Sequence, residues 1–381
     1  MKDKVLLTTV FSGYNYGSSL QALAGKLLLR GLGYDCQLVG MKSLIKGRDI
    51  RLKKLITILY RSFIFRGGRG ANALSIYKKS YNKTLIGDSV TRFAKFTNEF
   101  LQPTYLSWRG LKNAARDSVA CFAGSDQIWN SSTMYIDPMY YLRFAPAHKR
   151  IAFAPSFGRE FVADYNEEKM SKWIGEFAAL SVREDSGVKL IKDMTGRAAV
   201  NMLDPTLIVD GEAWKMKLGI ENKDTNYILA YFLDKPSVSA RRAIFELKES
   251  LGYEVIAIPY QFDEMDYCDK VVPAGPIEFL DLINNAKCVL TDSFHGTAFS
   301  INMHTPFYVF ARDYGSAHSQ NSRVESLLKR MKMQDRFEPV EVSQKYNQVD
   351  FIYSEEVLMA GRLKALDYLK SALNDIKRNE K

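Results

Sequence analysis

The chain has 381 residues, of which 46% are hydrophobic and 25% charged, as expected of a folded protein long enough for two domains of ordinary size. This composition excludes collagen-like, low-complexity and disordered classes. The 53 Lys and Arg residues exceed the 43 Asp and Glu residues, so the formal net charge is +10.

The excess positive charge lies in Met41–Lys83, which we call the basic segment. It carries twelve basic residues and one acidic residue, Asp49, for a net charge of +11, whereas the rest of the chain carries −1. Its basic residues are Lys42, Lys46, Arg48, Arg51, Lys53, Lys54, Arg61, Arg66, Arg69, Lys78, Lys79 and Lys83. A near-neutral body with one basic segment does not indicate a general nucleic-acid binder.

The sequence has no recognisable signal peptide, membrane-spanning stretch or metal-binding pattern. The apolar run Val5–Phe11 is too short for a signal peptide and has no small-residue cleavage pattern, and no stretch reaches the ~20 apolar residues that span a bilayer. We therefore predict a cytoplasmic protein. The four cysteines and four histidines show no metal-ligand spacing, so we expect no disulfide framework, metal or other cofactor.

The first half of the chain alternates between short apolar runs and segments of helical periodicity. Strands are predicted at Lys4–Phe11, Asp35–Val39, Ser118–Ala123, Arg150–Ala154, Ala179–Val182 and Ala198–Met202, and helices at Ser18–Leu32 and Asp185–Met194. Apolar residues at helical spacing between Arg51 and Arg66 predict a further helix inside the basic segment.

A second alternating series begins near Asn226. Strands are predicted at Tyr227–Leu233, Tyr253–Ile258, Lys287–Thr291 and Pro306–Phe310, and helices at Val238–Leu251, Glu278–Ala286, Gly296–Asn302, Arg323–Met331 and Glu355–Ile376. Two such series predict an α/β protein with two Rossmann-like parallel-sheet domains facing a cleft. We place the domains at residues 1–210 and 211–345, with the helix of 346–381 packing back toward the first domain. Ligands of such sheets bind at the carboxyl ends of the strands.

The first two strand ends with unusual side chains are Ser12–Ser19 and Gly124–Asn130. Asn15, Gly17 and Ser18 precede a helix and could cradle an anion with backbone N–H groups, although a turn capped by Ser18 explains them equally well. Ser125 and Asp126 follow a strand, and Ser125 is a candidate substrate contact. Asp126 could act as a general base toward a hydroxyl group, or simply cap the next turn.

The other two strand ends carry cationic candidates. Arg183 stands where a planar carboxylate or phosphate would bind, unless it pairs with Glu184 or Asp204. His295 lies in a polar turn just ahead of a predicted helix that starts at Gly296, where it could donate a proton to a phosphate. Ser293 and Gly296 flank it as candidate ligand contacts. Arg323 could reach the same cleft or lie on the surface. The spacing around Ser293 does not match a hydrolase nucleophile elbow.

Taken together, these strand ends resemble the polysaccharide pyruvyl transferase family. The matching stretches are Asn15–Ala22, Gly124–Trp129, Ser181–Glu184, Leu203–Thr206, Thr291–Gly296 and Asn321–Leu328. The resemblance implies a two-domain fold similar to the GT-B glycosyltransferases. It also implies phosphoenolpyruvate as donor and a pyruvate ketal as product, often across O4 and O6 of a hexose such as galactose. The implied acceptor belongs to a capsule, exopolysaccharide or cell-wall polymer, or to its lipid-linked precursor.

The residues suit this chemistry. Under the resemblance, Arg183 would bind the donor carboxylate or phosphate, His295 would bind the phosphate and supply a proton, and Asp126 would accept the proton of the attacking hydroxyl. Two alternatives stay open: a sugar-nucleotide-dependent glycosyltransferase, in which Glu278 is an unmarked candidate for binding the ribose, and a non-catalytic protein that binds carbohydrate or a membrane surface.

The basic segment carries its own hypothesis. Its amphipathic helix resembles those that lie in a membrane interface, with Lys53, Lys54 and Arg61 as contacts to an anionic inner leaflet where a lipid-linked acceptor would sit. The alternative is a helix that packs on the core and exposes a solvated basic face.

Overall fold

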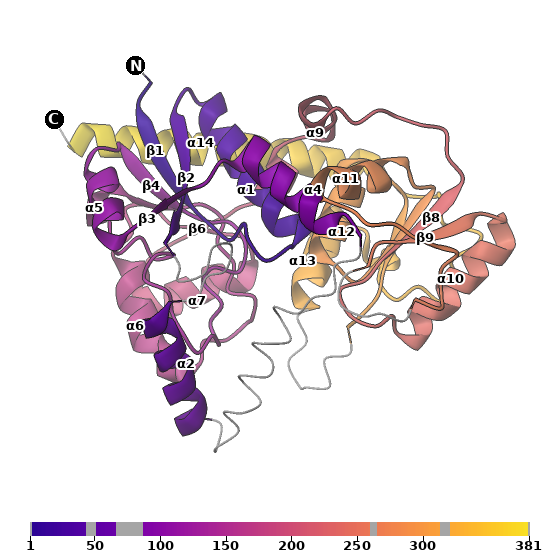
Figure 1. Ribbon diagram of the computed structural model, residues 1–381, viewed down its shortest axis with the longest axis horizontal. Coiled ribbons are helices and arrows are strands. Elements are labelled where there is room, and N and C mark those ends of the chain that lie inside the picture. Colours follow the sequence, from indigo (N-terminus) through magenta and orange to yellow (C-terminus); the bar gives the residue numbers. More distant parts are fainter. Residues whose placement is uncertain (1, 43–50, 66–86, 260–264, 313–320, 380–381) are drawn as a thin grey trace. The chain divides into compact units, whose positions relative to one another are not determined.

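The computed structural model describes residues 2–42, 51–65, 87–259, 265–312 and 321–379, which fall into two compact units (Figure 1). Unit 1 comprises Met1–Asn82, Thr97–Pro205 and Lys364–Lys381, and unit 2 comprises Lys83–Phe96 and Thr206–Leu363. Each unit has its own parallel sheet. The predicted α/β class with two Rossmann-like sheets is therefore confirmed.

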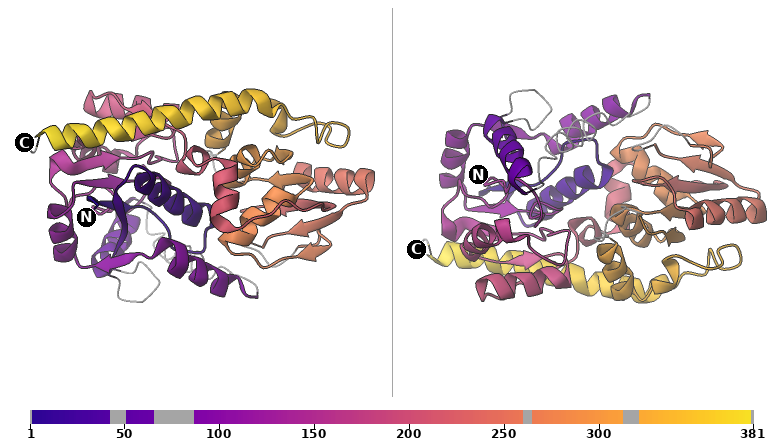
Figure 2. Two further views of the ribbon diagram at one scale, coloured as in Figure 1. Left: turned by 90° about the horizontal axis from the view of Figure 1, so that it is seen from above. Right: turned by 90° about the horizontal axis from the view of Figure 1, so that it is seen from below.

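Neither unit is one continuous stretch of chain, whereas the expected domains, residues 1–210 and 211–345, were continuous. Helix α4 (Ser89–Phe96) belongs to unit 2 although it precedes most of unit 1. It buries Phe93 and Phe96, and Arg92 pairs with Glu278 of α11 (Pro276–Asn285) at 3.2 Å. The C-terminal helix α14 (Phe351–Asn379) is one long helix (Figure 2) that changes unit after Leu363.

The sheet of unit 1 has the strand order β3-β2-β1-β4-β5, and all neighbouring strands are parallel. The strands are β1 (Lys4–Thr8), β2 (Asp35–Met41), β3 (Thr104–Leu106), β4 (Ala120–Ala123) and β5 (Arg150–Ala152). Strands β6 (Ser181–Val182) and β7 (Val200–Asn201) form a parallel pair, which a bridge between Ile151 and Ala179 connects to β5.

Apart from α2, the helices of unit 1 bury part of their surface within the unit. They are α1 (Tyr16–Gly31), α2 (Leu52–Phe65), α5 (Trp108–Arg116), α6 (Asp164–Gly175) and α7 (Asp185–Thr195), with short turns η1 (Thr97–Leu101) and η2 (Ala147–Lys149). Helix α1 packs closely because Gly25 has no side chain: a Cβ there would lie 3.0 Å from Leu7 Cδ2 of β1. The hydroxyl group of Tyr368 on α14 donates to the Ala152 carbonyl oxygen of β5 at 2.7 Å.

Unit 2 repeats the architecture with the strand order β10-β9-β8-β11-β12, again parallel throughout. Its strands are β8 (Tyr227–Tyr231), β9 (Glu254–Ala257), β10 (Lys270–Val271), β11 (Cys288–Thr291) and β12 (Phe307–Val309). Besides α4, α11 and the first part of α14, its helical elements are α8 (Pro205–Ile208), α9 (Gly211–Leu218), α10 (Val238–Leu251), α12 (Phe294–Asn302), α13 (Ser322–Met331) and η3 (Gln334–Arg336).

Both sheets share one topological feature. The first strand of each lies at the centre, and the chain winds to one side before it crosses to the other. The winding reverses between β1 and β4 in unit 1 and between β8 and β11 in unit 2. Ligands of open α/β sheets bind beyond the carboxyl ends of the strands at such a reversal. Asp126 follows β4 and His295 follows β11, so two of the predicted catalytic residues lie at these points.

Asn302, at the end of α12, is a buried junction within unit 2. Its Nδ2 donates to the carbonyl oxygens of Thr206 and Val209, both at 2.8 Å, and its Oδ1 accepts from Arg362 Nη2 at 2.9 Å. We expect Asn302→Ala to lower the free energy of unfolding by about 3 kcal/mol, because it leaves buried polar groups without partners.

Urea unfolding followed by circular dichroism measures this effect. Ser237→Ala, which removes the side-chain cap of α10 from a less buried position, serves as control and should cost about 1 kcal/mol. Equal losses in the two variants would contradict a junction role for Asn302.

Candidate functional site

Asp126 reaches across the reversal point of the unit 1 sheet. Its Oδ2 accepts a hydrogen bond from Ser18 Oγ in the first turn of α1 at 2.5 Å, and its Oδ1 accepts from the backbone N–H of Gln127 at 2.8 Å. The residue is 9% exposed and has a φ of 64°, in the left-handed region. It caps no helix. Instead, its carboxylate is held at the carboxyl edge of the sheet with one donor on each oxygen.

Backbone packing explains why small residues surround Asp126. A Cβ on Gly124 would lie 2.0 Å from the Phe153 carbonyl oxygen, and the φ of Gly124 is 130°, so only glycine fits. Gln21 of α1 fastens the same loop: its Oε1 accepts from the Ser125 N–H at 3.1 Å, and its Nε2 donates to the Val10 carbonyl oxygen at 2.7 Å. The loops after β1 and β4 therefore form one hydrogen-bonded body.

The start of α1 differs in detail from the expectation. The cap is Asn15, whose Oδ1 accepts from the Ser18 N–H at 2.9 Å, and the helix begins at Tyr16. Ser18 is therefore not the cap, and its hydroxyl group serves Asp126 instead. Gly17 lies buried in the first turn.

Arg183 is the cationic centre of this site. Its Nη1 donates to Asp204 Oδ2 at 2.6 Å, and the same oxygen accepts from Ser125 Oγ at 3.1 Å. The ion pair with Asp204 is the structural alternative that the sequence left open. Burial lowers the pKa of Arg183, but the charges of Asp204, Glu184 and Asp126 raise it by more, so the net shift is upward. The guanidinium is thus permanently charged and shared among carboxylates.

Glu184 is the third carboxylate around Arg183. It stands at the N-cap position of α7 yet makes no side-chain cap there. Its Oε1 accepts from Ser156 Oγ and from the Gly158 N–H, while the Ser156 N–H donates to the Asp126 carbonyl oxygen at 2.8 Å. Ser156 therefore connects the loop that carries Asp126 with the loop that follows β6.

Unit 2 has a matching carboxylate at its own reversal point. Asp292, directly after β11, accepts from the N–H groups of Leu233 and Asp234 after β8, at 2.6 and 3.1 Å. Arg312, beyond β12, pairs with Asp292 Oδ2 at 3.1 Å. Burial raises the pKa of Asp292 to about 6, although Arg312 and the two N–H groups favour the charged form. The group therefore titrates unusually close to neutrality.

His295 lies in the first turn of α12 rather than ahead of it, because the helix begins at Phe294 and is capped by Ser293. Ser293 Oγ accepts from the Gly296 N–H at 3.3 Å. The His295 side chain is largely buried, with its ring edge-on to that of Phe294 at 5.3 Å between centroids. A Cβ on Gly296 would lie 2.6 Å from Thr291 Oγ1, so glycine is needed for α12 to start this close to β11.

The structure gathers the predicted residues into one group in each unit. Ser18, Ser125, Asp126 and Arg183 belong to one hydrogen-bonded and charged network in unit 1, whereas Ser293, His295 and Gly296 share the first turn of α12 in unit 2. Arg323 lies in the first turn of α13, after Asn321, whose Oδ1 accepts from the Arg312 N–H at 3.3 Å.

Sequence inspection undervalued several residues of these groups. The sequence pattern marks Asp204 and Glu184 only as partners of Arg183, and it assigns no role to Asp292 or Arg312. Arg312 carries a signal that could have found it, since it is a lone cation two residues beyond the predicted strand Pro306–Phe310. Across the ranges that the structure describes, no cluster of three His, Cys, Asp or Glu side chains could hold a metal ion.

The helix of the basic segment forms as predicted, as α2, but its cations are divided. Lys53 is exposed and Lys54 half-buried, whereas the Arg61 guanidinium is turned inward: its Nη1 donates to Asn166 Oδ1 at 2.9 Å. Arg61 is thus engaged within unit 1, which argues against its expected role as a lipid contact. The rest of the basic segment, apart from Met41, Lys42 and Arg51, lies outside the described residues. Among the described helices, none is both long and apolar enough for a membrane crossing.

Comparison with solved structures finds chains of similar length at low identity. A UDP-GlcNAc 2-epimerase from Neisseria meningitidis, bound to UDP-GlcNAc, is 9% identical, with coverage of 99% of this chain and 94% of that one and a TM-score of 0.44. S. aureus MnaA, in a co-structure with UDP, is 11% identical (97% and 90% coverage, TM-score 0.45). The glycosyltransferase SnogD from Streptomyces nogalater is 10% identical (99% and 98% coverage, TM-score 0.37). With TM-scores below 0.5, these structures carry no argument about activity.

Sequence comparison is more informative. General stress protein 30 from Bacillus subtilis (strain 168) is 42% identical over 66 residues, which cover 17% of this chain and 19% of that protein's length. The family model described as polysaccharide pyruvyl transferase matches residues 15–314, well over half of the chain, and this span includes Asp126, Arg183 and His295. The chain therefore belongs to the polysaccharide pyruvyl transferase family.

Proposed function

We propose that the protein transfers the enolpyruvyl group of phosphoenolpyruvate onto two hydroxyl groups of one hexose, at O4 and O6 of galactose or a similar sugar, to form a pyruvate ketal. Family membership supports pyruvyl transfer to a polysaccharide. The observation that carries the proposed chemistry is Asp126, a carboxylate that Ser18 fixes at the strand ends of unit 1 beside a permanently charged guanidinium.

The reaction balances without a redox partner. A proton adds to C3 of phosphoenolpyruvate, which makes C2 electrophilic, and the first hydroxyl oxygen bonds to C2 as its proton leaves to a base. The C2–O bond to phosphate then breaks, and the second hydroxyl oxygen takes its place on C2. Of the two hydroxyl protons released, the balance places one on C3 and one on the phosphate. The protein must supply a base, an acid and positive charge for the anionic donor.

In unit 1 we assign the base to Asp126. Each carboxylate oxygen of Asp126 accepts one hydrogen bond, Oδ2 from Ser18 and Oδ1 from Gln127. Each oxygen therefore keeps a lone pair with which to accept a hydroxyl proton. We assign binding of the anionic donor to Arg183, because a planar guanidinium matches the geometry of a carboxylate or phosphate. Because Asp204 already holds Nη1, the first contribution of Arg183 is a positive charge beside Asp126.

In unit 2 we assign phosphate binding and proton donation to His295. It lies in the first turn of α12, where backbone N–H groups and the helix dipole favour an anion. Arg312 adds positive charge near the end of β11, and Asp292 partly neutralises it. Gly17, Asn15, Ser293, Gly296 and Arg323 are retained as proposed substrate contacts. The scheme needs no cofactor.

For the acceptor, we propose a lipid-linked or polymeric hexose of a capsule or exopolysaccharide pathway, met by a cytoplasmic protein at the anionic inner face of the membrane. The support is the basic segment, whose +11 charge is separate from the residues assigned to catalysis. Phosphate release from phosphoenolpyruvate with a panel of lipid-linked and aryl hexosides identifies the acceptor.

In a thermal-shift screen, stabilisation by UDP or GDP but not by phosphoenolpyruvate would instead favour a nucleotide-sugar enzyme.

Asp126→Asn should lower kcat about 1,000-fold with little change in the KM for phosphoenolpyruvate, because the amide keeps the shape but cannot accept a proton. Ser18→Ala is the matched variant: it removes one hydrogen bond to Asp126 but leaves the base, so we expect a loss of only about tenfold. Steady-state phosphate release measures both. A fully active Asp126→Asn enzyme would rule out the assigned base.

Arg183→Ala and His295→Ala should each reduce turnover with phosphoenolpyruvate at least 100-fold, because the donor loses positive charge or its acid. Arg183→Ala also leaves Asp204 buried without its cation, so unfolding must be checked in parallel. His295→Gln is the milder companion, since it retains a polar group of similar size. If both alanine variants kept wild-type turnover while folded, the donor assignment would be wrong.

Asp292 predicts a pH dependence of stability. Its pKa of about 6 in the folded protein exceeds the ordinary value of 3.8, so the folded state binds more protons between these values. The free energy of unfolding should therefore fall by about 3 kcal/mol as the pH rises through this window, and then level off. Asp292→Asn should lack this fall.

Urea unfolding between pH 4 and pH 7, with hydrogen exchange of the β8 and β11 amides, locates the effect. Asp224→Asn, which changes a carboxylate whose side chain is 96% exposed in the same unit, should retain the wild-type slope. An Asp292→Asn profile that superimposes on the wild type would show that Asp292 does not titrate in this range.

A further inference from the structure

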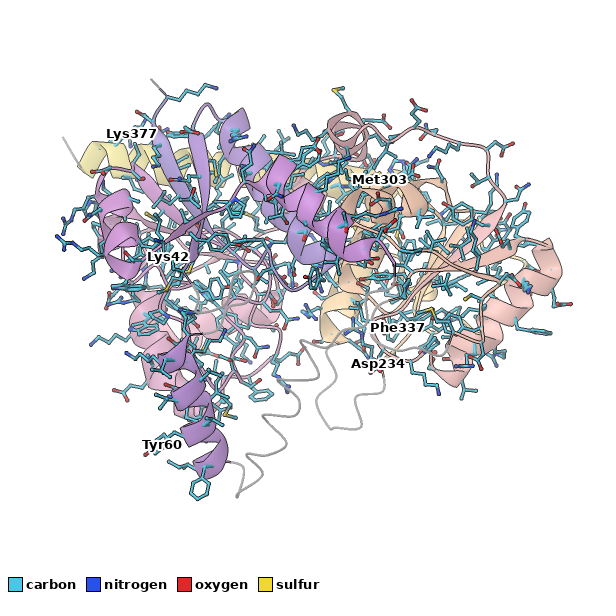
Figure 3. All side chains as sticks on the ribbon, in the orientation of Figure 1. Lys42, Tyr60, Asp234, Met303, Phe337 and Lys377 are labelled. Atoms are coloured by element: carbon cyan, nitrogen blue, oxygen red, sulfur yellow. The ribbon has the colours of Figure 1, made fainter. Side chains whose placement is uncertain are left out.

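Helix α2 exposes its apolar side instead of burying it. Leu52, Ile56, Leu59 and Phe63 recur at intervals of four, three and four residues and so share one face, with Tyr60 beside them. Their exposed fractions are 64%, 57%, 44%, 70% and, for Tyr60, 65%. Figure 3 shows Tyr60 projecting away from the ribbon of α2. We call these five residues the apolar ridge.

The body of unit 1 fixes the orientation of the ridge through two arginines, one just before α2 and one within it. Arg51, just before the helix, pairs with the buried carboxylate of Asp137, and its Nη1–Oδ1 distance is 3.1 Å. Arg61 donates to Asn166 and lies over the ring of Tyr165, with 5.7 Å from Cζ to the ring centroid. Asn166 is itself fully buried and donates to the Ser131 and Thr133 carbonyl oxygens.

This arrangement reverses the usual layout of a surface helix. A helix that packs on a domain turns its apolar stripe inward and its cations outward. On α2 the two arginines face inward and the ridge faces outward, so neither the core-packing alternative nor a purely electrostatic contact describes it. A rigidly held apolar face of this kind indicates an interaction site.

We propose that the apolar ridge inserts into the interfacial layer of an anionic membrane, parallel to its surface. Helix α2 has 14 residues, which corresponds to a length of about 21 Å, and it contains aliphatic and aromatic residues suited to the boundary between headgroups and acyl chains. It has no acidic residue, and it belongs to a segment with twelve cations and one acid. This charge matches an anionic lipid surface, which also attracts the exposed Lys53 beside the ridge.

The mode of binding is therefore insertion, with charge as a supplement. Apolar burial in lipid resists salt, whereas attraction between Lys53 and anionic headgroups is screened by it. A ridge held by Arg51 and Arg61 would also dock unit 1 in a defined orientation. The inference concerns membrane attachment and does not depend on the proposed donor or on the residues assigned to catalysis.

The test is co-sedimentation of the full-length protein with vesicles of phosphatidylcholine alone or with phosphatidylglycerol added, at low and high salt. The double variant Ile56→Asp, Phe63→Asp should lower the partition coefficient on anionic vesicles at least tenfold at both salt concentrations. Phe245→Asp is the matched control, because Phe245 is 66% exposed on α10 of unit 2 and should be replaceable without effect.

Lys53→Ala separates charge from insertion. It should weaken binding to anionic vesicles about fivefold at low salt, and leave binding at high salt unchanged. Turnover with a soluble aryl hexoside is measured for every variant and should equal that of the wild type, so a failure of the membrane proposal is distinguishable from a failure of the proposed reaction.

Two results would overturn the proposal. One is a wild-type protein that stays in the supernatant with anionic vesicles, and the other is a double variant that binds them as well as the wild type does. If the wild type without vesicles is an oligomer that the double variant converts to a monomer, and no vesicle binding is seen, the ridge is covered by a second copy of the chain instead.

Discussion

A carboxylate that crosses the reversal point of a parallel sheet is the constraint on which both units depend. Asp126 reaches from the end of β4 to Ser18 of α1, and Asp292 reaches from the end of β11 to the amides of Leu233 and Asp234 beyond β8. Neighbouring parallel strands end at the same edge, so their loops must be held without help from the sheet ladder. A short acidic side chain supplies acceptors at that point and fixes the loops that carry the candidate site.

The two carboxylates differ in the charges that surround them. Asp126 and its neighbours Glu184 and Asp204 surround one guanidinium, whose pKa they raise. Asp292 is more deeply buried, and Arg312 does not fully offset the loss of hydration, so its pKa rises to about 6. One fold motif therefore yields a carboxylate beside a buried guanidinium and another whose pKa of about 6 lies close to physiological pH.

Local pattern predicted the elements well where periodicity is long, and poorly where partners are distant. Helix α10 has the predicted bounds, Val238–Leu251. Its ends are local signals, because Ser237 caps its start and Gly252 adopts the αL conformation at its end. The sequence also pointed to the strand ends of the site, since polar residues after apolar runs are a local signal. It could not assign α4 to unit 2 or show that Arg61 turns inward. Both depend on contacts between residues far apart in the chain, Arg92 with Glu278 and Arg61 with Asn166.

The division of α14 between the units has a consequence for biosynthesis. Lys364–Lys381 belongs to unit 1, where Tyr368 contacts β5 and Lys377 pairs with Asp3, just before β1, at 2.8 Å, so residues made before unit 2 contact residues made after it. Unit 1 cannot be completed on the ribosome before the whole of unit 2 has been translated. In many multidomain proteins the N-terminal domain folds first and independently during synthesis. Unit 1 cannot follow this order. Its early strands must wait, with their apolar faces incompletely covered, until the last turns of α14 have left the ribosome.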